Sequence, residues 1–513
     1  MKIGCVYTVE RGATGEKPLP FAMDIPFGMA IISTVLKRAG HEVQLLVFSP
    51  RSHYAEVIAT YIQTHRPKLF CLTAVSTQFG FVREIARLVK RLDPSIFVIL
   101  GGHHASLDSE DAIKPPDFDA ICVGEGDRSV IELAQRIEAH EPVTGIHHLW
   151  LKRADGSIEK NPPSPFDQDL DSLPYIDRQM WEPWIAEPDK YPSVLLGRGC
   201  PFRCTYCSAH AMQRLAEGRF VRMRSPENII GEIADICARY PSVDNVYLEV
   251  ETIAHQKEAV PLFAKLAELN SGREQALSFG VNFTVTSTFI KNEEHCREFL
   301  LMLKRANVVY LNIGLESGSE RLRRDVLRRP KYTNAEFLQF CRIAREYGVQ
   351  LDFYVLIDIP GETPADFKET VQLVRAAKPK MVQLSVFYPY LGTDLANVAL
   401  ERGLVTRDSL SPDLERARAA LDLPTFSRRR VRLEYVLFWF KVYRGVWPVS
   451  RILAATVEGI IAGSPRLWSA YSRLKEESRV VKYIRGRYRS IRNRKEDPGN
   501  IHRPTKIEFT YSD

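Results

Sequence analysis

Two long stretches of this 513-residue chain alternate between short apolar runs and segments of helical length. In the first stretch, up to about residue 147, turn residues bound each apolar run, as in the strands of a parallel sheet that is buried on both faces. The pattern predicts a doubly wound, Rossmann-like α/β domain. Its expected helices are Pro26–Ala39, Ala55–Thr64 and Phe81–Leu92, and its expected strands are Ile3–Thr8, Val43–Phe48, Leu69–Leu72, Phe97–Leu100 and Ala120–Val123.

The second stretch, residues 191–400, alternates in the same way and carries six apolar runs. Six strands with helices between them predict a partial (β/α)6 barrel, in which the chemistry takes place at the C-terminal ends of the strands. The expected strands are Val194–Leu196, Asn245–Glu249, Leu277–Phe283, Val308–Gly314, Leu351–Ile357 and Met381–Val386.

Two further segments complete the predicted organisation. Residues 148–190 are rich in Pro, Asp and Ser, and their prolines interrupt any long helix, so we interpret them as an extended linker. Residues 401–513 have a helical pattern and are basic. The chain is therefore expected to consist of an N-terminal domain (1–147), a linker (148–190), a barrel domain (191–400) and a helical C-terminal region (401–513).

The net charge of +7 is unevenly distributed. Residues from Leu421 to Asp513 contain 20 Lys+Arg and 9 Asp+Glu, a net charge of +11, whereas the rest of the chain has a net charge of −4. Because the positive charge is confined to this C-terminal segment, we expect no nucleic-acid-binding surface over the rest of the chain. No run of 18 apolar residues and no signal-peptide pattern is present, so we expect a cytoplasmic protein.

One tight group of cysteines lies directly after the first predicted barrel strand. Cys200, Cys204 and Cys207 have the spacing C-x3-C-x2-C, and thiolates are the usual ligands of iron–sulfur clusters. Three ligands leave one iron of a four-iron cluster open to bind a further molecule. A zinc site with His210 as the fourth ligand is the simpler alternative. The other cysteines, on apolar strands and helices, are interpreted as core residues.

The segment Arg198–Cys207, with Tyr206 at the aromatic position of the motif, resembles the radical S-adenosylmethionine (SAM) superfamily. The resemblance implies a [4Fe-4S] cluster held by Cys200, Cys204 and Cys207, with SAM on the open iron and Tyr206 near its adenine. Reduction of such a cluster splits SAM into methionine and a 5′-deoxyadenosyl radical. The family also implies a reducing partner such as flavodoxin or ferredoxin.

Further elements resemble the radical SAM subgroup that carries an N-terminal cobalamin-binding domain. These are Gly314–Ser319 (GLESGS), Ile359–Thr363 (IPGET) and Tyr388–Thr393 (YPYLGT). The resemblance implies that Tyr206, Glu251, Glu316, Ser317 and Gly361 contact SAM, with Glu249 as the substitute for Glu251. Each element alone also has an ordinary structural explanation, since Pro-Gly is a common turn pair and an acidic residue favours a helix N-terminus.

The first domain resembles the cobalamin domains of this subgroup at the ends of three strands. Thr73, the pair Gly101-Gly102, and Gly124-Glu125 occupy the matching positions, and the resemblance implies that they contact cobalamin. The D-x-H-x-x-G element, which supplies a histidine to cobalt in other cobalamin proteins, is absent, so we expect no histidine on the lower face of the cobalt. His103 and His104 are interpreted as polar contacts. A domain that has lost cobalamin is the alternative.

The resemblance implies an enzyme that methylates an unactivated carbon of a small-molecule or lipid-like substrate, through a 5′-deoxyadenosyl radical and methylcobalamin. Two alternatives are open: a radical SAM cyclase or rearrangement enzyme without methyl transfer, and an iron–sulfur electron-transfer protein. The SAM-side elements count against the electron carrier, which has no use for them. No catalytic side chain can be assigned from the sequence.

The C-terminal region contains two segments of interest. Val431–Trp447 has a wide apolar stripe at helical spacing, which predicts a helical cap that packs on the barrel mouth. Arg485–Lys495 interleaves cations with Tyr488 and Ile491, a pattern that suits an anionic membrane surface. We therefore expect the tail to make a weak peripheral contact with the inner membrane face.

Overall fold

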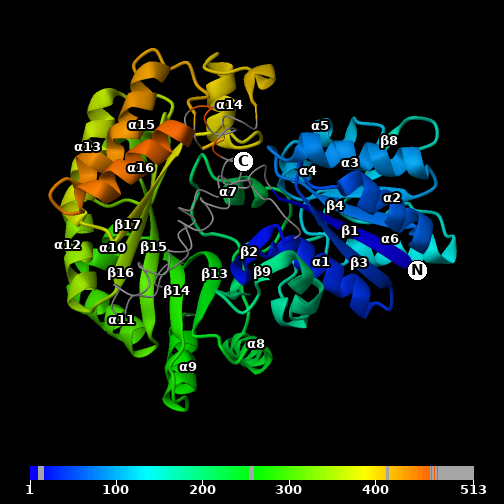
Figure 1. Cartoon of the computed structure of the whole chain (residues 1–513), viewed down its shortest axis with the longest axis horizontal. Coiled ribbons are helices and arrows are strands. Elements are labelled where there is room, and N and C mark those ends of the chain that lie inside the picture. Colours follow the sequence, from blue (N-terminus) through cyan, green and yellow to red (C-terminus); the bar gives the residue numbers. More distant parts are fainter. Residues whose placement is uncertain are drawn as a thin grey trace. The chain divides into compact units, whose positions relative to one another are not determined.

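The computed structural model describes residues 1–9, 17–253, 259–411, 415–416 and 418–462, together with 464, 467 and 471. The chain divides into two compact units, which are treated separately below. The first consists of Met1–Glu251 and Tyr390–Asn397, and the second of Thr252–Pro389 and the described residues from Val398 on. Figure 1 labels the elements of both units.

A seven-stranded sheet forms the centre of the first unit, with the strand order β3-β1-β4-β5-β6-β7-β8. The five strands from β3 to β6 in this order pair in parallel, which confirms the predicted doubly wound domain. In such sheets ligands bind at the carboxyl ends of the strands. The strands are β1 (Lys2–Thr8), β3 (Glu42–Phe48), β4 (Leu69–Thr73), β5 (Phe97–Gly101), β6 (Ala120–Cys122), β7 (Leu149–Lys152) and β8 (Ile158–Lys160).

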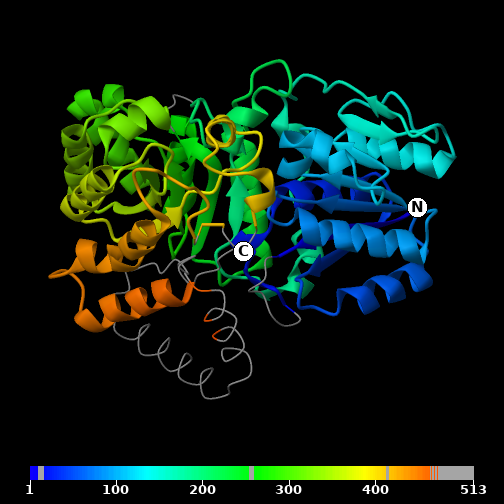
Figure 2. The same cartoon turned by 90° about the horizontal axis from the view of Figure 1, so that it is seen from above.

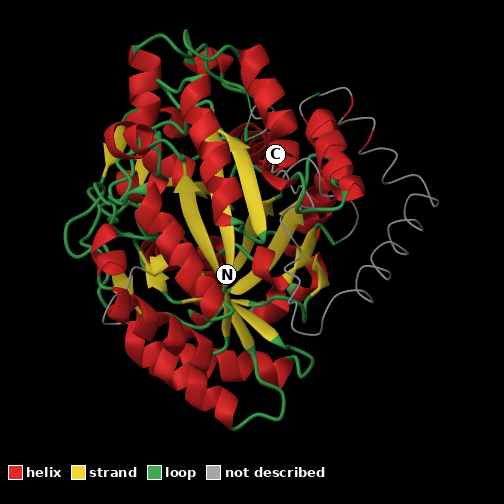
Figure 3. Ribbon diagram, turned by 90° about the vertical axis from the view of Figure 1, so that its left-hand side faces the viewer, coloured by secondary structure: helices red, strands yellow, loops and turns green. Residues whose placement is uncertain are grey.

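Helices cover both faces of this sheet (Figure 2; Figure 3 colours the secondary structure of the chain), and a separate apolar core lies on each side. Helices α1 (Phe27–Arg38) and α6 (Ser129–Ala139) contribute to one core, and α2 (Tyr54–His65) and α3 (Phe79–Leu92) to the other. The buried residues of α3 recur at helical spacing, so one stripe of the helix faces the sheet. They are Val82, Ile85, Ala86 and Val89.

The segment predicted as an extended linker has more structure than its prolines indicated. β7 adds to the sheet antiparallel to β6, and β8 adds antiparallel to β7. Farther along, β9 (Ile185–Glu187) pairs with β2 (Leu19–Phe21), and the fully buried Trp181 packs edge-on against Tyr7 at 5.9 Å between ring centroids. Each of these strands is three or four residues long, too short to show a periodic sequence pattern.

The second sheet has six strands in the order β10-β13-β14-β15-β16-β17. The pairs β10–β13, β14–β15, β15–β16 and β16–β17 are parallel, in agreement with the predicted partial barrel. Strand β13 extends four residues beyond its expected end and includes Glu251. The strands are β10 (Ser193–Leu195), β13 (Asn245–Ile253), β14 (Ser278–Phe283), β15 (Val308–Glu316), β16 (Gln350–Ile357) and β17 (Met381–Val386).

Two helices near the C-terminus, α15 (Arg428–Tyr443) and α16 (Val449–Ala462), lie side by side (Figures 1 and 2). The buried stripe of α15 packs on α13 (Pro364–Ala377), where Phe438 and Phe367 have ring centroids 6.0 Å apart. The predicted cap is therefore helical but packs on a helix that follows β16. Arg485–Lys495 lies outside the described residues. None of the described helices is long and apolar enough to cross a membrane.

Candidate functional site

The three predicted cluster ligands lie in one loop, residues 199–207, called here the cysteine loop. It follows the short strand β11 (Gly197–Arg198), which pairs antiparallel with β12 (Arg222–Met223). Gly199 begins the loop at φ +91°, and a Cβ at this position would lie 2.3 Å from the Phe220 carbonyl oxygen. Only glycine fits such a close backbone approach, so the tight entry to the loop is encoded directly before Cys200.

The three thiols lie near one another within this loop. Cys204 is buried, Cys200 and Cys207 are half-buried, and the backbone N–H of Cys207 donates to the Cys204 carbonyl at 3.1 Å. Burial, together with the neighbouring thiols of Cys207 and Cys204, raises the pKa of the Cys200 thiol to about 12. Such thiols ionise readily only when a cationic centre stabilises the thiolates. The donor set therefore fits an iron–sulfur cluster.

Among the described residues, no group of three or more His, Cys, Asp or Glu side chains is arranged to hold a single metal ion. Three thiolates that each bind a different iron of a cluster are spaced more widely than the ligands of one ion. His210, the fourth ligand in the zinc alternative, lies on α7 (Ser208–Met212) with its Nε2 3.4 Å from Asp394 Oδ2. His210 thus pairs with an acidic residue outside the cysteine loop.

The YPYLGT element is tied to the cysteine loop through residues of the first unit. Asp394, just after this element, binds Arg214 at 2.6 Å, and the Leu395 N–H donates to the Thr205 carbonyl at 2.9 Å. Gly392 has φ +86°, and a Cβ there would lie 2.5 Å from the Leu107 carbonyl oxygen. The glycine allows this segment to pack against the backbone of the first domain.

Two arginines join the cysteine loop to the loop that follows β6. Arg198 and Arg222 are register partners on the β11–β12 ribbon. Arg198 binds both carboxylate oxygens of Asp127, at 2.6 and 3.2 Å, and Arg222 binds both oxygens of Glu125, at 2.9 and 2.5 Å. Paired bidentate contacts of this kind fix both distance and orientation. Glu125, predicted to contact cobalamin, thus directs its carboxylate to the ribbon from which the cysteine loop begins.

In the first unit, Glu251 lies beside the cysteine loop and Tyr206 lies within it. Glu251 is near the end of β13, and its Oε1 accepts a hydrogen bond from the Gly199 N–H at 3.2 Å. Desolvation by the surrounding protein raises the pKa of this carboxyl, although part of its surface stays accessible to solvent. Tyr206 is half-buried between two of the cysteines. Glu251 and Tyr206 lie next to and within the cysteine loop, and their contacts with SAM stay predictions.

The predicted cobalamin contacts lie at the carboxyl ends of three neighbouring strands. Thr73 ends β4, Gly101 ends β5, and Gly124 follows β6. Gly102 has φ +91°, and a Cβ there would lie 2.5 Å from Thr73 Oγ1 and 2.7 Å from the Ala74 carbonyl oxygen. The glycine pair therefore allows the loops after β4 and β5 to touch. The edge so formed is the one at which doubly wound sheets bind ligands.

The two histidines after Gly102 differ in environment. His104 is buried, with its ring 4.0 Å from the Phe79 ring and its Nε2 3.7 Å from Asp111 Oδ2. His103 is exposed at the edge of the sheet, and desolvation by the surrounding protein lowers its pKa. His104 thus has a structural position in the core, and His103 is the one of the two that reaches the strand-end surface.

In the second unit, Glu316 ends β15 in a left-handed conformation, with φ +61°. Such strain in a residue other than glycine persists only where its surroundings enforce it, and it is concentrated at functional sites. The Arg329 guanidinium donates to the Gly314 carbonyl, and a Cβ on Gly314 would lie 2.5 Å from Glu316 Oε1. Glu316 and Arg329 are thus neighbours at the carboxyl end of this strand.

Ser317 has a structural environment. Its hydroxyl is fully buried and lies 3.3 Å from Thr370 Oγ1 on α13. Gly318 donates from its N–H to the same Thr370 oxygen at 2.8 Å, and Ser319 donates to Asp366 at 2.6 Å. The GLESGS element is therefore anchored on α13. Its side-chain hydroxyls serve that anchor, and a SAM contact from Ser317 stays a prediction.

Gly361 lies in the turn between β16 and α13. It has φ +78° with open space where a Cβ would be, and its carbonyl accepts from Arg321 at 3.0 Å. The Pro-Gly pair thus makes a left-handed turn, the ordinary structural role of such a pair. A contact between Gly361 and SAM stays a prediction.

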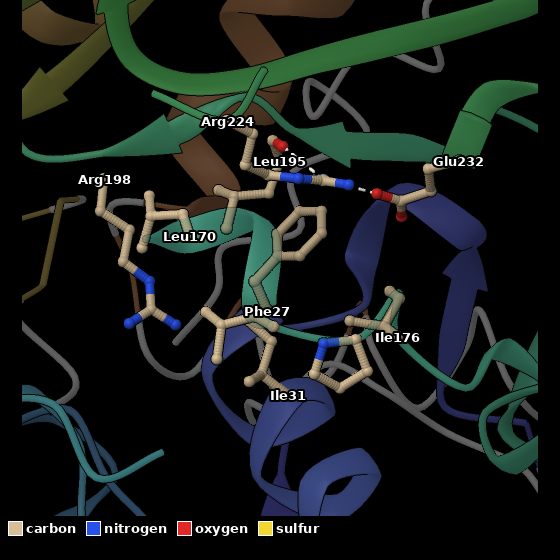
Figure 4. Close-up of a pocket in the computed structure, with 10 residues that line it drawn as sticks. Phe27, Ile31, Leu170, Ile176, Leu195, Arg198, Arg224 and Glu232 are labelled. Carbon is tan, nitrogen blue, oxygen red and sulfur yellow. Dashed lines mark hydrogen bonds and ion pairs between the residues drawn. The ribbon is translucent and has the colours of Figure 1, made fainter. Parts of the chain in front are cut away.

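A small cavity of about 20 Å³ lies beside Arg198 (Figure 4). It has room for about one water and none for a substrate. Glu232, on its wall, accepts from Arg224 at 2.6 Å and from Arg178 at 3.1 Å, which forms a buried arginine–glutamate–arginine triad. The lining residues are Phe27, Ile31, Leu170, Leu173, Pro174, Ile176, Leu195, Arg198, Arg224 and Glu232.

Sequence reasoning missed the side chains that hold the cysteine loop in place: Arg198, Arg222, Asp127 and Asp394. Arg222 and Glu125 are 97 residues apart, and Arg214 and Asp394 are 180 apart. No local spacing or periodicity connects such pairs. Only the proximity of Arg198 to Cys200 in the sequence gave a signal that charge matters at this loop.

Two family models match the chain. The radical SAM superfamily matches residues 194–374, and the B12 binding domain matches residues 25–134. The chain is a radical SAM protein with a B12-binding domain. The radical SAM domain implies a [4Fe-4S] cluster and SAM, and the B12-binding domain implies cobalamin. These matches confirm the cofactors expected from the sequence.

The relatives of this radical SAM protein include methyltransferases and a cyclase. An uncharacterized methyltransferase of Pyrococcus horikoshii is 24% identical over 74% of this chain and 79% of its own. The hopanoid C-3 methylase of Methylococcus capsulatus is 24% identical over 83% of this chain and 78% of its own. The anaerobic magnesium-protoporphyrin IX monomethyl ester cyclase of Rubrivivax gelatinosus is 22% identical over 72% of this chain and 65% of its own.

Two solved structures share the fold. The radical SAM methyltransferase TsrM of Kitasatospora setae superposes with a TM-score of 0.63 and 19% identity, and covers 79% of this chain and 77% of its own. The cobalamin-dependent SAM radical enzyme OxsB superposes with a TM-score of 0.63 and 14% identity, and covers 96% of this chain and 75% of its own.

Proposed function

We propose that this radical SAM protein transfers a methyl group from SAM to an unactivated carbon of a small, lipid-like substrate, in a reaction that depends on cobalamin. One observation carries the proposal. The cysteine loop and the loop after β6 of the B12-binding domain are fastened together by Arg198–Asp127 and Arg222–Glu125 within one compact unit. A radical enzyme that uses both cofactors on one substrate requires the two sites to keep a fixed relation.

The chain's own residues orient and hold the reacting groups. When bound, the cluster supplies the electron that cleaves SAM, and cobalamin supplies a carrier for the methyl group. The thiols of the cysteine loop would hold the cluster, and Glu251 lies where the SAM amino group is expected. Thr73 and Gly102 lie at the strand-end edge at which doubly wound sheets bind ligands, so these residues would line the cobalamin site.

The proposal of a lipid-like substrate is supported by the similarity to the hopanoid C-3 methylase. That relative aligns over 438 residues, or 83% of this chain, which is more than the two family models cover. The alignment therefore takes in sequence beyond the cofactor domains, where substrate contacts are expected.

A radical cyclase without methyl transfer is the second candidate. The similarity to the magnesium-protoporphyrin IX monomethyl ester cyclase supports it, at 22% identity over 72% of this chain. Both candidates use the same cysteine loop and the same SAM contacts. They differ only in the fate of the SAM methyl group, so a label on that methyl distinguishes them.

Anaerobic turnover with methyl-deuterated SAM and a cell lipid extract tests the proposal. We expect a product that carries the intact deuterated methyl group, found by mass spectrometry with the wild-type chain and absent with Cys204→Ala. A product that appears without deuterium while 5′-deoxyadenosine accumulates would favour the cyclase. The labelled product would also identify the substrate.

A further inference from the structure

The C-terminal region carries most of the exposed large apolar side chains among the described residues, and six of them lie on α15 and α16. Eight of the thirteen such residues lie between Leu433 and Leu467, and the other five are scattered singly over the rest of the chain. Single exposed apolar residues are normal on protein surfaces, whereas a cluster of them marks an interaction site. The α15–α16 pair is therefore the outstanding surface feature of the second unit.

Helix α16 exposes an apolar stripe along one face. Val449, Leu453, Val457 and Ile460 are 71%, 58%, 52% and 39% exposed, and their spacing of 4, 4 and 3 residues places them on one side of the helix. Ile452 and Gly459 lie on a different side and are buried, with Gly459 against Trp439 of α15. The helix thus packs on α15 through one face and presents its aliphatic residues on another.

Helix α15 exposes a stripe of mixed character. Leu433 and Phe440 are exposed and seven residues apart, which places them on one face of the helix. Arg429 lies four residues before Leu433, and Arg444 lies four residues after Phe440, so an exposed cation flanks each end of the apolar pair. Among the described residues, neither arginine has an ion-pair partner.

The charge around this surface is positive. Residues Arg428–Ala462 contain seven Lys+Arg and two Glu. Of the two glutamates, Glu434 is buried and binds Arg430 and Lys441. Two copies of this surface would bring like charges together, which disfavours pairing with a second copy of the chain. An apolar face bordered by cations instead matches the boundary between headgroups and acyl chains in an anionic bilayer.

We propose that the exposed stripes of α15 and α16, here called the docking face, bind the surface of an anionic lipid membrane. The aliphatic residues of α16 enter the headgroup region, and Arg429 and Arg444 contact lipid phosphates. The 51 residues from Gly463 to Asp513 contain 13 Lys+Arg and 6 Asp+Glu, so the sequence that follows α16 adds to the attraction. The proposal goes beyond the proposed reaction and is tested without turnover.

Co-sedimentation of the full chain with vesicles tests the docking face. We expect binding to vesicles of phosphatidylcholine with phosphatidylglycerol, little binding to phosphatidylcholine alone, and weaker binding as salt is raised. The double variant Leu453→Glu/Val457→Glu should lose binding to the anionic vesicles. The variant Arg429→Gln/Arg444→Gln should bind about 30-fold more weakly, since each cation near such a surface contributes about a factor of five.

The matched control is Val57→Glu/Leu301→Glu, which makes the same change at two exposed apolar residues on other helices. It should bind like the wild type, and circular dichroism should show that all variants are folded. Unchanged binding of the Leu453→Glu/Val457→Glu variant would overturn the proposal, as would equal binding to neutral vesicles. A wild-type dimer that becomes a monomer in this variant, without vesicle binding, would assign the face to a second copy.

Discussion

The guanidinium of Arg222 binds both carboxylate oxygens of Glu125, at 2.9 and 2.5 Å. The arginine side chain is only 2% exposed, and it also donates to the carbonyls of Asp167 and Phe220. Its partner Glu125 follows β6 in the B12-binding domain, whereas Arg222 lies on the strand that pairs with the entry to the cysteine loop. The contact therefore connects the two predicted cofactor sites directly.

Replacing Glu125 by Gln should destabilise the folded chain by about 1–3 kcal/mol, because it leaves the buried Arg222 cation without its counter-ion. The midpoint of urea unfolding measures the effect. Glu110→Gln is the matched control, since Glu110 pairs with Lys160 where both side chains are exposed, and loss of such a pair costs at most about 1 kcal/mol. Equal effects of the two substitutions would contradict a structural role for the Arg222–Glu125 pair.

Gly102→Ala should lower the retention of cobalamin. A Cβ at this position would lie 2.5 Å from Thr73 Oγ1, and the φ of +91° disfavours any other residue, so the loops after β4 and β5 must move apart. The corrinoid retained after gel filtration, measured by its absorbance, gives the readout. Gly28→Ala is the control because a Cβ there meets no atom within 4 Å. Undiminished retention in Gly102→Ala would show that this edge does not hold the cofactor.

The cobalt of bound cobalamin should have no histidine on its lower face. His104 is buried against Phe79, and no D-x-H-x-x-G element follows β1. The electron paramagnetic resonance spectrum of the Co(II) state should therefore lack nitrogen hyperfine splitting. If splitting is seen and disappears in His103→Ala, the expectation is wrong and His103 is the ligand.

The buried carboxyls of Asp358 and Glu362 should make stability depend on pH. Burial raises the pKa of both groups well above the usual range, so the folded state keeps protons that the unfolded state releases. The free energy of unfolding should then fall as pH rises above the unfolded pKa of about 4, by about 1.4 kcal/mol per pKa unit of difference. Glu362→Gln should flatten this dependence above the unfolded pKa of about 4, whereas Glu110→Gln should not. An unchanged slope in Glu362→Gln would contradict the assignment.

The sequence predicted the five parallel strands of the first sheet and the six strands of the second, because these strands are apolar and bounded by turns. It also predicted the cysteine loop, since Cys200, Cys204 and Cys207 are close together in the chain and follow an apolar strand. The turn after β5 was recognisable because the pair Gly101-Gly102 follows an apolar run, and few other residues allow so tight a turn. These features depend on local sequence, so local patterns reveal them.

Features that depend on distant residues were not predictable. The strands β7 and β8 are too short to show periodicity, and the contacts of Arg222 with Glu125 join residues 97 positions apart. Glu125 was assigned to cobalamin on resemblance alone, whereas its carboxylate binds two arginines of the β11–β12 ribbon. In the same way, the hydroxyl of Ser317 serves the packing of its loop on α13.

The most direct test of the account is the formation of 5′-deoxyadenosine by the anaerobically reconstituted, reduced chain. The account predicts that the wild type forms it from SAM and that Cys204→Ala does not, because the cluster loses one of its three protein ligands. Cys237→Ala, which changes a half-buried cysteine outside the cysteine loop, should behave like the wild type. Normal 5′-deoxyadenosine formation by Cys204→Ala would contradict the assignment of the cluster to Cys200, Cys204 and Cys207.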